Sequence, residues 1–139
     1  PDTARVVFDL RAAENEDMTQ LQSRVERAIT QSAAAYGATA KIAVLKAMPA
    51  AEIDAEMTAL VAEAIKEVLG EAALMPVRST PGSEDFFHYP VQRPAIKAGF
   101  WGLGTGLTPG LHHPDMRFDL DALPVGVKIF KACVIKILG

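Results

Sequence analysis

The clearest secondary-structure signal in the chain lies in residues 4–29, ARVVFDLRAAENEDMTQLQSRVERAI. Apolar and polar residues alternate over residues 4–10, which predicts a strand. The acidic turn at residues 14–17 supplies capping groups and negative charge for the positive end of a helix. Apolar residues then recur at helical spacing up to the natural stop at Gly37, namely Met18, Leu21, Val25, Ile29 and Tyr36. The stretch therefore predicts a strand followed by an amphipathic helix.

The same two patterns continue along the chain. Residues 39–47 predict a second strand, and residues 51–69 predict a second amphipathic helix that ends at Gly70. The region after this helix is rich in proline and glycine, contains all three histidines and has one clear short strand at residues 98–103. A last helix is predicted from near Asp121, with a buried stripe made by Leu123, Val127, Phe130, Val134 and Ile137. This order predicts an α/β or α+β fold.

Composition narrows the class of protein. The chain has 139 residues, of which 50% are hydrophobic and 22% charged, as expected for one globular domain. A net charge of −3 argues against binding to nucleic acid or to an anionic membrane. The single cysteine, Cys133, excludes an internal disulfide and favours a reducing compartment. No apolar run reaches the roughly 18 residues of a membrane span, so a soluble, cytoplasmic protein is expected.

The first candidate for chemistry is the segment PGSEDFF, residues 81–87. The backbone N–H groups of Gly82 and Ser83 are suited to bind a carboxylate or a developing oxyanion, and Glu84 or Asp85 to orient a metal ligand. The alternative is an ordinary turn in which Ser83 caps a short helix and the acidic residues favour its dipole. The residues alone leave both interpretations open.

The second candidate is the segment GLHHPD, residues 110–115. A neutral imidazole is a good ligand for zinc, and neighbouring histidines point in roughly opposite directions, so at most one of His112 and His113 would face a given metal. The alternative is a pair of surface histidines in a polar loop. His88, between Phe87 and Tyr89, is interpreted as a packing or rim residue.

Two further features carry little functional weight. The glycines at 102, 104 and 106 do not open a helix directly, so a turn at a strand end is favoured over a nucleotide loop. Cys133 has no partner at catalytic spacing and is interpreted as a small core residue. Since a catalytic zinc ion normally takes three protein ligands and the chain offers one credible histidine, composition predicts no complete metal site.

A family resemblance is carried by three motifs together: GSEDF at 82–86, LHHP at 111–114 and FDLDALPVG at 118–126. In order and spacing they resemble the C-terminal part of the metal-dependent amidohydrolases and carboxypeptidases, the group of hippurate hydrolase, the N-acyl-amino-acid amidohydrolases and the indoleacetyl-amino-acid hydrolases. Weaker matches lie at AYGA, residues 35–38, and at Met48-Pro49 with Asp54. The resemblance covers essentially all 139 residues.

The resemblance implies an architecture and three site residues. Residues 1–49 would form the second half of a two-layer strand-helix-strand lid that also serves dimerisation, and residues 50–139 the last helices and strands of a zinc-peptidase-like α/β catalytic domain. His112 matches the family's last metal-ligand histidine. Gly82 and Ser83 match the substrate-binding side of the metal site. An asparagine common before the aspartate at the lid exit is replaced by Ile53.

The resemblance also implies a reaction. Metal-activated water attacks the amide bond of an N-acyl amino acid or small peptide, and the cofactor is a divalent metal ion, zinc or else manganese, cobalt or nickel. The family's other ligands, its catalytic glutamate and its lid histidine precede everything matched here, so this chain carries no general base and is expected to be inactive alone. The abrupt start at Pro1 is interpreted as a cut inside the lid.

Two other hypotheses remain open. The chain is alternatively a non-catalytic interaction module that forms a homodimer through the lid, because an uncovered strand edge favours association. A third hypothesis is that a missing N-terminal segment or a second chain supplies the absent ligands.

Overall fold

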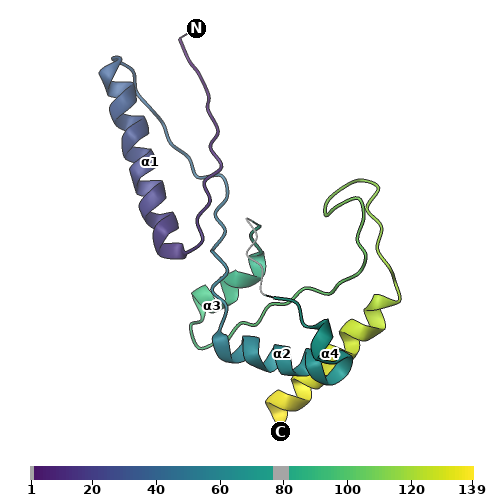
Figure 1. Ribbon diagram of the computed structural model, residues 1–139. Coiled ribbons are helices and arrows are strands. Elements are labelled where there is room, and N and C mark those ends of the chain that lie inside the picture. Colours follow the sequence, from purple (N-terminus) through teal and green to yellow (C-terminus); the bar gives the residue numbers. More distant parts are fainter. Residues whose placement is uncertain (1, 77–81) are drawn as a thin grey trace. The chain divides into compact units, whose positions relative to one another are not determined.

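The computed structural model of the protein describes residues 2–76 and 82–139. Its elements in chain order are α1 (Asn15–Ala35), α2 (Ala55–Leu69), η1 (Glu71–Ala73), η2 (Asp85–Phe87), α3 (His88–Gln92) and α4 (Ala122–Leu138), where η denotes a 3-10 helix (Figure 1). They belong to two compact units. Unit 1 comprises Pro1–Glu52 with Ser79–Ile96, and unit 2 comprises Ile53–Arg78 with Lys97–Gly139.

The predicted α/β fold is wrong for the residues that the structure describes. Helices account for 48% of them, strand pairing for 2%, and no sheet is formed. The segments predicted as strands, 4–10, 39–47 and 98–103, take part in no ladder. The strand pairing among the described residues is an isolated antiparallel bridge between Thr108 and Arg117, which lies outside these three segments. Alternation specifies which side chains share a face, whereas a sheet also needs a neighbouring extended segment about 4.8 Å away with aligned N–H and C=O groups. The predicted strand-helix-strand layer and the sheet of the catalytic segment are therefore absent from these residues.

The helix predicted after the first extended segment is confirmed as α1. Its first turn carries Glu16 and Asp17, which complement the positive end of the helix dipole, and Gln22 donates to Glu26 at 2.8 Å along its surface. The helix stops where Gly37 adopts a φ of 67°, a left-handed conformation that glycine takes without a steric penalty. Local sequence thus accounts for both ends of α1.

Unit 1 nevertheless leaves the apolar face of α1 without a closed core. None of the residues of α1 is buried. Val6 and Phe8 from the first extended segment line a shallow hollow of about 500 Å³ with Val25, Ala28, Ile29 and Ser32 of the helix. Val6 stays 70% exposed and Phe8 57%. The apolar residues that the sequence predicts to be buried thus lie next to one another, but they remain accessible to solvent.

Unit 2 contains the main core, built where α2 packs on α4. The start of α2 is set by Asp54, whose carboxylate accepts from Met57 N at 2.9 Å, and its end by Gly70 at a φ of 86°. Buried residues of both helices form one cluster, with Ala64 0%, Ile129 1%, Ala132 8% and Cys133 7% exposed. Partly buried residues surround it: Leu60, Val61, Ile65, Val68, Trp101, Leu103 and Val125.

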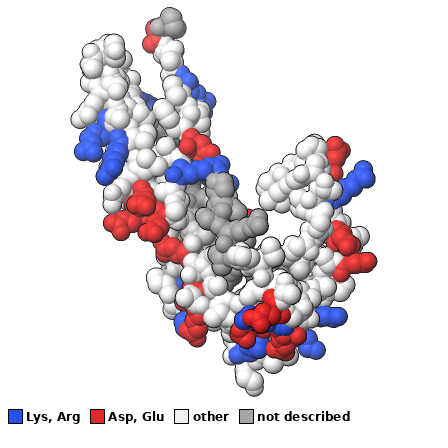
Figure 2. Space-filling model, viewed as in Figure 1, with Lys and Arg blue, Asp and Glu red and all other residues white. Residues whose placement is uncertain are grey.

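Charged side chains link the same two helices at their surface. Lys136 Nζ of α4 lies 2.9 Å from Glu67 Oε2 of α2. Within α2 itself, Lys66 Nζ lies 3.2 Å from Glu63 Oε1. The hydrogen bond and negative charge of Glu67 raise the pKa of Lys136, and those of Glu63 raise the pKa of Lys66. On the face in view, Figure 2 shows basic and acidic side chains close together in this part of the molecule.

The face of α4 that packs inward differs from the predicted one. The expected stripe is exposed, with Leu123 49%, Val127 67%, Phe130 62%, Val134 51% and Ile137 59% accessible. The buried residues are Gly126, Ile129, Ala132 and Cys133. Both stripes are apolar, and α2 approaches the one with the smaller side chains, which permits close contact between the helices. The small glycine at 126 has only Leu103 close to the position that a Cβ would occupy, at 3.1 Å.

None of the helices in the described part of the chain combines the length and the apolar composition that a bilayer crossing requires.

Candidate functional site

The loop that carries the candidate metal ligand belongs to unit 2 and is closed by backbone hydrogen bonds. Thr108 N donates to Arg117 O at 3.0 Å, and Arg117 N donates to Thr108 O at 2.9 Å. Within the loop, His113 N donates to Gly110 O at 3.2 Å, which forms a turn around His112. The position of His112 is thus defined by main-chain bonds on both sides of it.

The two neighbouring histidines have different surroundings. His113 Nδ1 accepts from Asp115 N at 3.1 Å and lies 3.9 Å from Asp115 Oδ2. His112 is exposed, and its ring forms no hydrogen bond with any other described residue. Its φ of 65° lies in the left-handed region, which costs a residue with a Cβ about 1 kcal/mol or more. His113 is therefore engaged by its own loop, while the ring nitrogens of His112 are available to a ligand.

The described residues do not assemble a metal site around His112. Across residues 2–76 and 82–139, no three His, Cys, Asp or Glu side chains gather closely enough to hold a metal ion. The carboxylate of Asp119, in the segment that follows, serves local structure, because its Oδ1 accepts from Asp121 N at 2.9 Å. A catalytic zinc ion needs three protein ligands. The donor set present here therefore fits one ligand of a metal site and not a complete one.

The candidate substrate residues, Gly82 and Ser83, belong to unit 1. Both are exposed and precede η2 in the chain. The residue that precedes η2 is Glu84, and it makes no side-chain cap, so Ser83 does not cap this helix. Neither backbone N–H of Gly82 and Ser83 donates to an oxygen of the other described residues. A short helix with Asp85 in its first turn does follow, and its N-cap position is held by Glu84 and not by Ser83. Both interpretations of this segment stay open.

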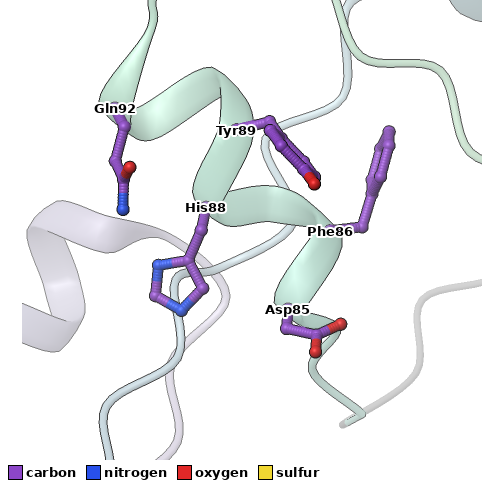
Figure 3. A pocket seen from close by; sticks show the side chains of 5 residues that line it. All are labelled: Asp85, Phe86, His88, Tyr89 and Gln92. Carbon is purple, nitrogen blue, oxygen red and sulfur yellow. The ribbon is translucent and has the colours of Figure 1, made fainter.

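A hollow of about 440 Å³ follows directly in the sequence, lined by Asp85, Phe86, His88, Tyr89 and Gln92 (Figure 3). Figure 3 shows His88 and Gln92 on one side of this short helical segment and Phe86 and Tyr89 on the other. The Phe86 and Tyr89 rings meet edge to face, with centroids 6.0 Å apart. The polar side chains, His88 and Gln92, therefore point away from the aromatic pair, Phe86 and Tyr89. The side chains that line the hollow do not converge on one point, as the groups of a catalytic site would.

Sequence reasoning did not single out Tyr89 or Gln92 as lining residues. The i, i+4 spacing of Asp85 with Tyr89 and of His88 with Gln92 would have indicated them if residues 85–92 had been expected to be helical. Pro90 obscures that pattern, although proline is tolerated in the first turn of a helix. His88 is half-buried, as its interpretation as a rim residue requires.

The two features given little weight in the sequence behave accordingly. Cys133 is buried in the α2–α4 core, and burial raises the pKa of its thiol, which disfavours the reactive thiolate. The glycine-rich residues 102–106 continue toward the Thr108–Arg117 bridge and open no helix. Neither feature contributes to the candidate site.

Comparison with protein families decides the assignment. The family described as "Peptidase family M20/M25/M40" matches residues 4–136. The chain belongs to the M20 peptidase family. This confirms the resemblance to the metal-dependent amidohydrolases at the level of the family. Peptidases of this family generally depend on divalent metal ions.

Individual relatives agree in part with this assignment. The M20 chain is 29% identical over 132 residues to "Probable hydrolase sll0100" of Synechocystis, covering 91% of the chain and 33% of the relative. It is 27% identical over 146 residues to "IAA-amino acid hydrolase ILR1-like 2" of Arabidopsis thaliana, covering 99% and 32%. It is also 32% identical over 134 residues to "Putative glutamate--cysteine ligase 2-3" of Rhodococcus jostii, covering 95% and 17%. No solved structure matches significantly.

The same matches show how much of its relatives' length the M20 chain covers. It spans about a third of the length of the two hydrolase relatives and less of the third relative. The roles of His112, Gly82 and Ser83 and the boundary between residues 49 and 50 stay predictions.

Proposed function

We propose that this chain is part of an M20 hydrolase that cleaves the amide bond of N-acyl amino acids or small peptides. The support is the family match over residues 4–136 combined with the exposed, left-handed His112 in a bonded loop. The Arabidopsis relative is named an IAA-amino acid hydrolase, which favours this substrate class. In this proposal His112 supplies one ligand of a divalent metal site, with zinc, manganese, cobalt or nickel as the candidate ions.

Gly82 and Ser83 have the second role in the proposal. Their exposed N–H groups would bind the carboxylate of the substrate or the oxygen of its scissile carbonyl. Backbone donors suit this task because they are oriented by the chain and do not titrate. In this proposal Gly82 and Ser83 bind and orient the substrate and take no part in proton transfer.

The general base and the remaining ligands would come from polypeptide beyond these 139 residues. This follows from the donor set, since His112 has no two companions among the described residues that could complete a site. The isolated chain is therefore proposed to be inactive.

Metal content and hydrolysis of N-acetyl and N-benzoyl amino acids by the purified chain test the incomplete site. We expect no stoichiometric metal after gel filtration and no turnover with zinc, manganese, cobalt or nickel. Tight stoichiometric metal together with turnover would refute the proposal.

The ligand role of His112 needs a second test, in an active enzyme assembled from this chain and the unmatched remainder of the Synechocystis relative. His112→Ala should lower metal affinity by more than the roughly 10–100-fold that loss of an outer-shell partner costs. His113→Ala is the matched control and should retain metal, because His113 bonds within its own loop. Equal retention by both variants contradicts the assignment.

A second candidate function is a dimerisation module formed by residues 1–49. The observation that favours it is the exposure of Val6, Val7 and Phe8 beside α1, at 70%, 67% and 57%. Analytical ultracentrifugation tests it with Val7→Lys, whose side chain does not line the hollow on α1. A dimer that dissociates in this variant supports the module, and a monomeric parent chain contradicts it.

A further inference from the structure

The side-chain amide of Asn15, the only asparagine in the chain, holds a segment that lies far from it in the sequence. Asn15 Oδ1 accepts from Ala50 N at 2.8 Å, and Asn15 Nδ2 donates to Glu52 Oε1 at 2.5 Å. In addition, Glu52 N donates to Ala50 O at 3.0 Å, which closes a three-residue turn. The first residue of α1 is therefore bonded to both ends of the turn at residues 50–52.

An amide is the side-chain group that fits these two partners. A backbone N–H needs an acceptor, an ionised carboxylate only accepts, and an asparagine amide presents an acceptor oxygen beside a donor NH2 group. Aspartate at position 15 would offer no donor to Glu52, and leucine would serve neither partner. Because Asn15 begins α1, the amide is carried by a regular helix that runs to Ala35. Position 15 thus combines a rigid base with a group that both donates and accepts.

The turn that Asn15 holds is the last part of unit 1 before the chain enters unit 2, which begins at Ile53. On the unit 2 side of this crossing, Asp54 N donates to the carbonyl oxygen of Ala98, a residue that is 2% exposed. Ile53 lies between these bonded positions. It is 41% exposed and forms no hydrogen bond with another described residue. At this crossing, residue 53 is therefore bonded to neither unit.

We propose that the Asn15 amide is a brace that fixes the direction in which the chain leaves unit 1, and that the backbone turns between the units at Ile53. Residues that absorb a change of φ and ψ between two bodies are a few loop or element-terminal positions. The bonds of Asn15 exclude residues 50–52 from that role, and the bond of Asp54 excludes the start of α2. Asn15 is thus a positioning residue, and the inference is independent of the proposed function.

Backbone 15N relaxation of the 139-residue chain tests the brace through the order parameters of residues 50–54. In the parent chain, residues 50–52 should be as ordered as α1, at about 0.85, with a minimum at Ile53. Asn15→Ala removes both bonds and keeps a good helix former at the start of α1. It should lower the order parameters of residues 50–52 below about 0.6. Hydrogen exchange of the Ala50 N–H should become about threefold to tenfold faster, as expected for one lost hydrogen bond.

A reciprocal exchange of the two side chains distinguishes these bonds from a general loss of packing. Asn15→Asp keeps the acceptor for Ala50 N but places two carboxylates together, so Glu52 should become mobile while the Ala50 N–H stays protected. The double variant Asn15→Asp/Glu52→Gln restores the donor and the acceptor in swapped positions. It should return the order parameters of residues 50–52 to those of the parent chain.

The matched control is Gln22→Ala, because the amide of Gln22 donates to Glu26 at 2.8 Å within α1 and not to a distant segment. It should leave the order parameters of residues 50–54 unchanged. Far-UV circular dichroism of every variant should match that of the parent chain, which shows that α1 is intact.

Four results overturn the inference. These are parent-like order at residues 50–52 in Asn15→Ala, an equal loss of order in Gln22→Ala, an exchanged pair as mobile as Asn15→Ala, and a parent chain in which Ile53 is as ordered as its neighbours. Order at residues 50–52 that is lost in Asn15→Ala and returns in the exchanged pair supports it. Because no hydrolysis is measured, failure of the brace leaves the proposed function unaffected.

Discussion

Helices α1 and α2 are both amphipathic in sequence, yet they differ in how much of the apolar face is covered. Helix α1 has 21 residues and buries none of them, whereas α2 has 15 residues and buries Ala64 completely against α4. Most helical stability in proteins comes from packing an apolar face and not from propensity. An amphipathic pattern therefore identifies the face available for packing, and the presence of an opposing surface determines whether stability is gained.

The largest expected difference is in the free energy of unfolding lost when an isoleucine is truncated in the covered core of unit 2 or on the uncovered face of α1. Ile129 of α4 is 1% exposed, so Ile129→Ala should destabilise unit 2 by about 2–4 kcal/mol. Ile29 of α1 is only partly buried, and Ile29→Ala should cost less than about 1 kcal/mol. Urea unfolding followed by the fluorescence of Trp101, the single tryptophan, reports on unit 2, and segment-resolved hydrogen exchange reports on α1. Equal losses at both positions would contradict the contrast.

The next effect is expected at the close approach between residue 99 and α2. A Cβ added at Gly99 would lie 3.1 Å from Met57 Cβ, an atom fixed to the helix backbone. Gly99→Ala should therefore destabilise unit 2 by about 1–2 kcal/mol in the same urea experiment.

Gly126→Ala is the comparison, because its new Cβ meets the mobile end of Leu103, also at 3.1 Å. The helix propensity of alanine, about 1 kcal/mol better than that of glycine, should offset the contact. A loss at Gly126 as large as that at Gly99 would show that the core cannot adjust at either position.

A smaller difference in stability is expected when the residue before α1 or before α2 is replaced by alanine. Asp54→Ala removes the cap on Met57 N and should cost about 1 kcal/mol. Glu14, at the corresponding position before α1, makes no side-chain cap, so Glu14→Ala should change stability by no more than about 0.5 kcal/mol. Helix content by far-UV circular dichroism during urea unfolding measures both, and a larger cost at Glu14 would reverse the comparison.

The smallest effect is expected at the ion pair between Lys136 and Glu67. Lys136→Gln should lower Tm slightly at low salt and not at 1 M salt, because exposed pairs are screened. Glu67 raises the pKa of Lys136 in the folded chain above 10.5, so the pair contributes fully below pH 10.5 and loses its contribution as pH rises through the folded value.

Lys128→Gln on the same helix is the control for this ion pair. Among the described residues Lys128 has no ion-pair partner, so its replacement should not alter the salt dependence of Tm. A salt-dependent loss in both variants would point to general charge effects and not to the pair.

The candidate site was accessible to sequence reasoning only through its motifs. Residues 110–115 indicated one ligand histidine without distinguishing His112 from His113, and the family resemblance favoured His112. The structure adds a physical difference, because Asp115 N donates to the ring of His113 and not to that of His112. Residues around His88 were harder to predict, since Pro90 masks the helical spacing of Asp85 with Tyr89.

Local rules were sufficient for the three long helices of this chain, α1, α2 and α4. The glycines at 37 and 70 place the ends of α1 and α2 within a few residues of their observed positions, because these interactions involve neighbours in the chain. The start of α2 was predicted near residue 51 and lies at Ala55, after the cap formed by Asp54. Strands and packing faces were not determined in this way. Residues 4–10 alternate as a strand does, but a ladder requires a partner from elsewhere, and α4 has two apolar faces of which α2 covers one. Long-range contact decides both, and no residue pattern within a single segment specifies it.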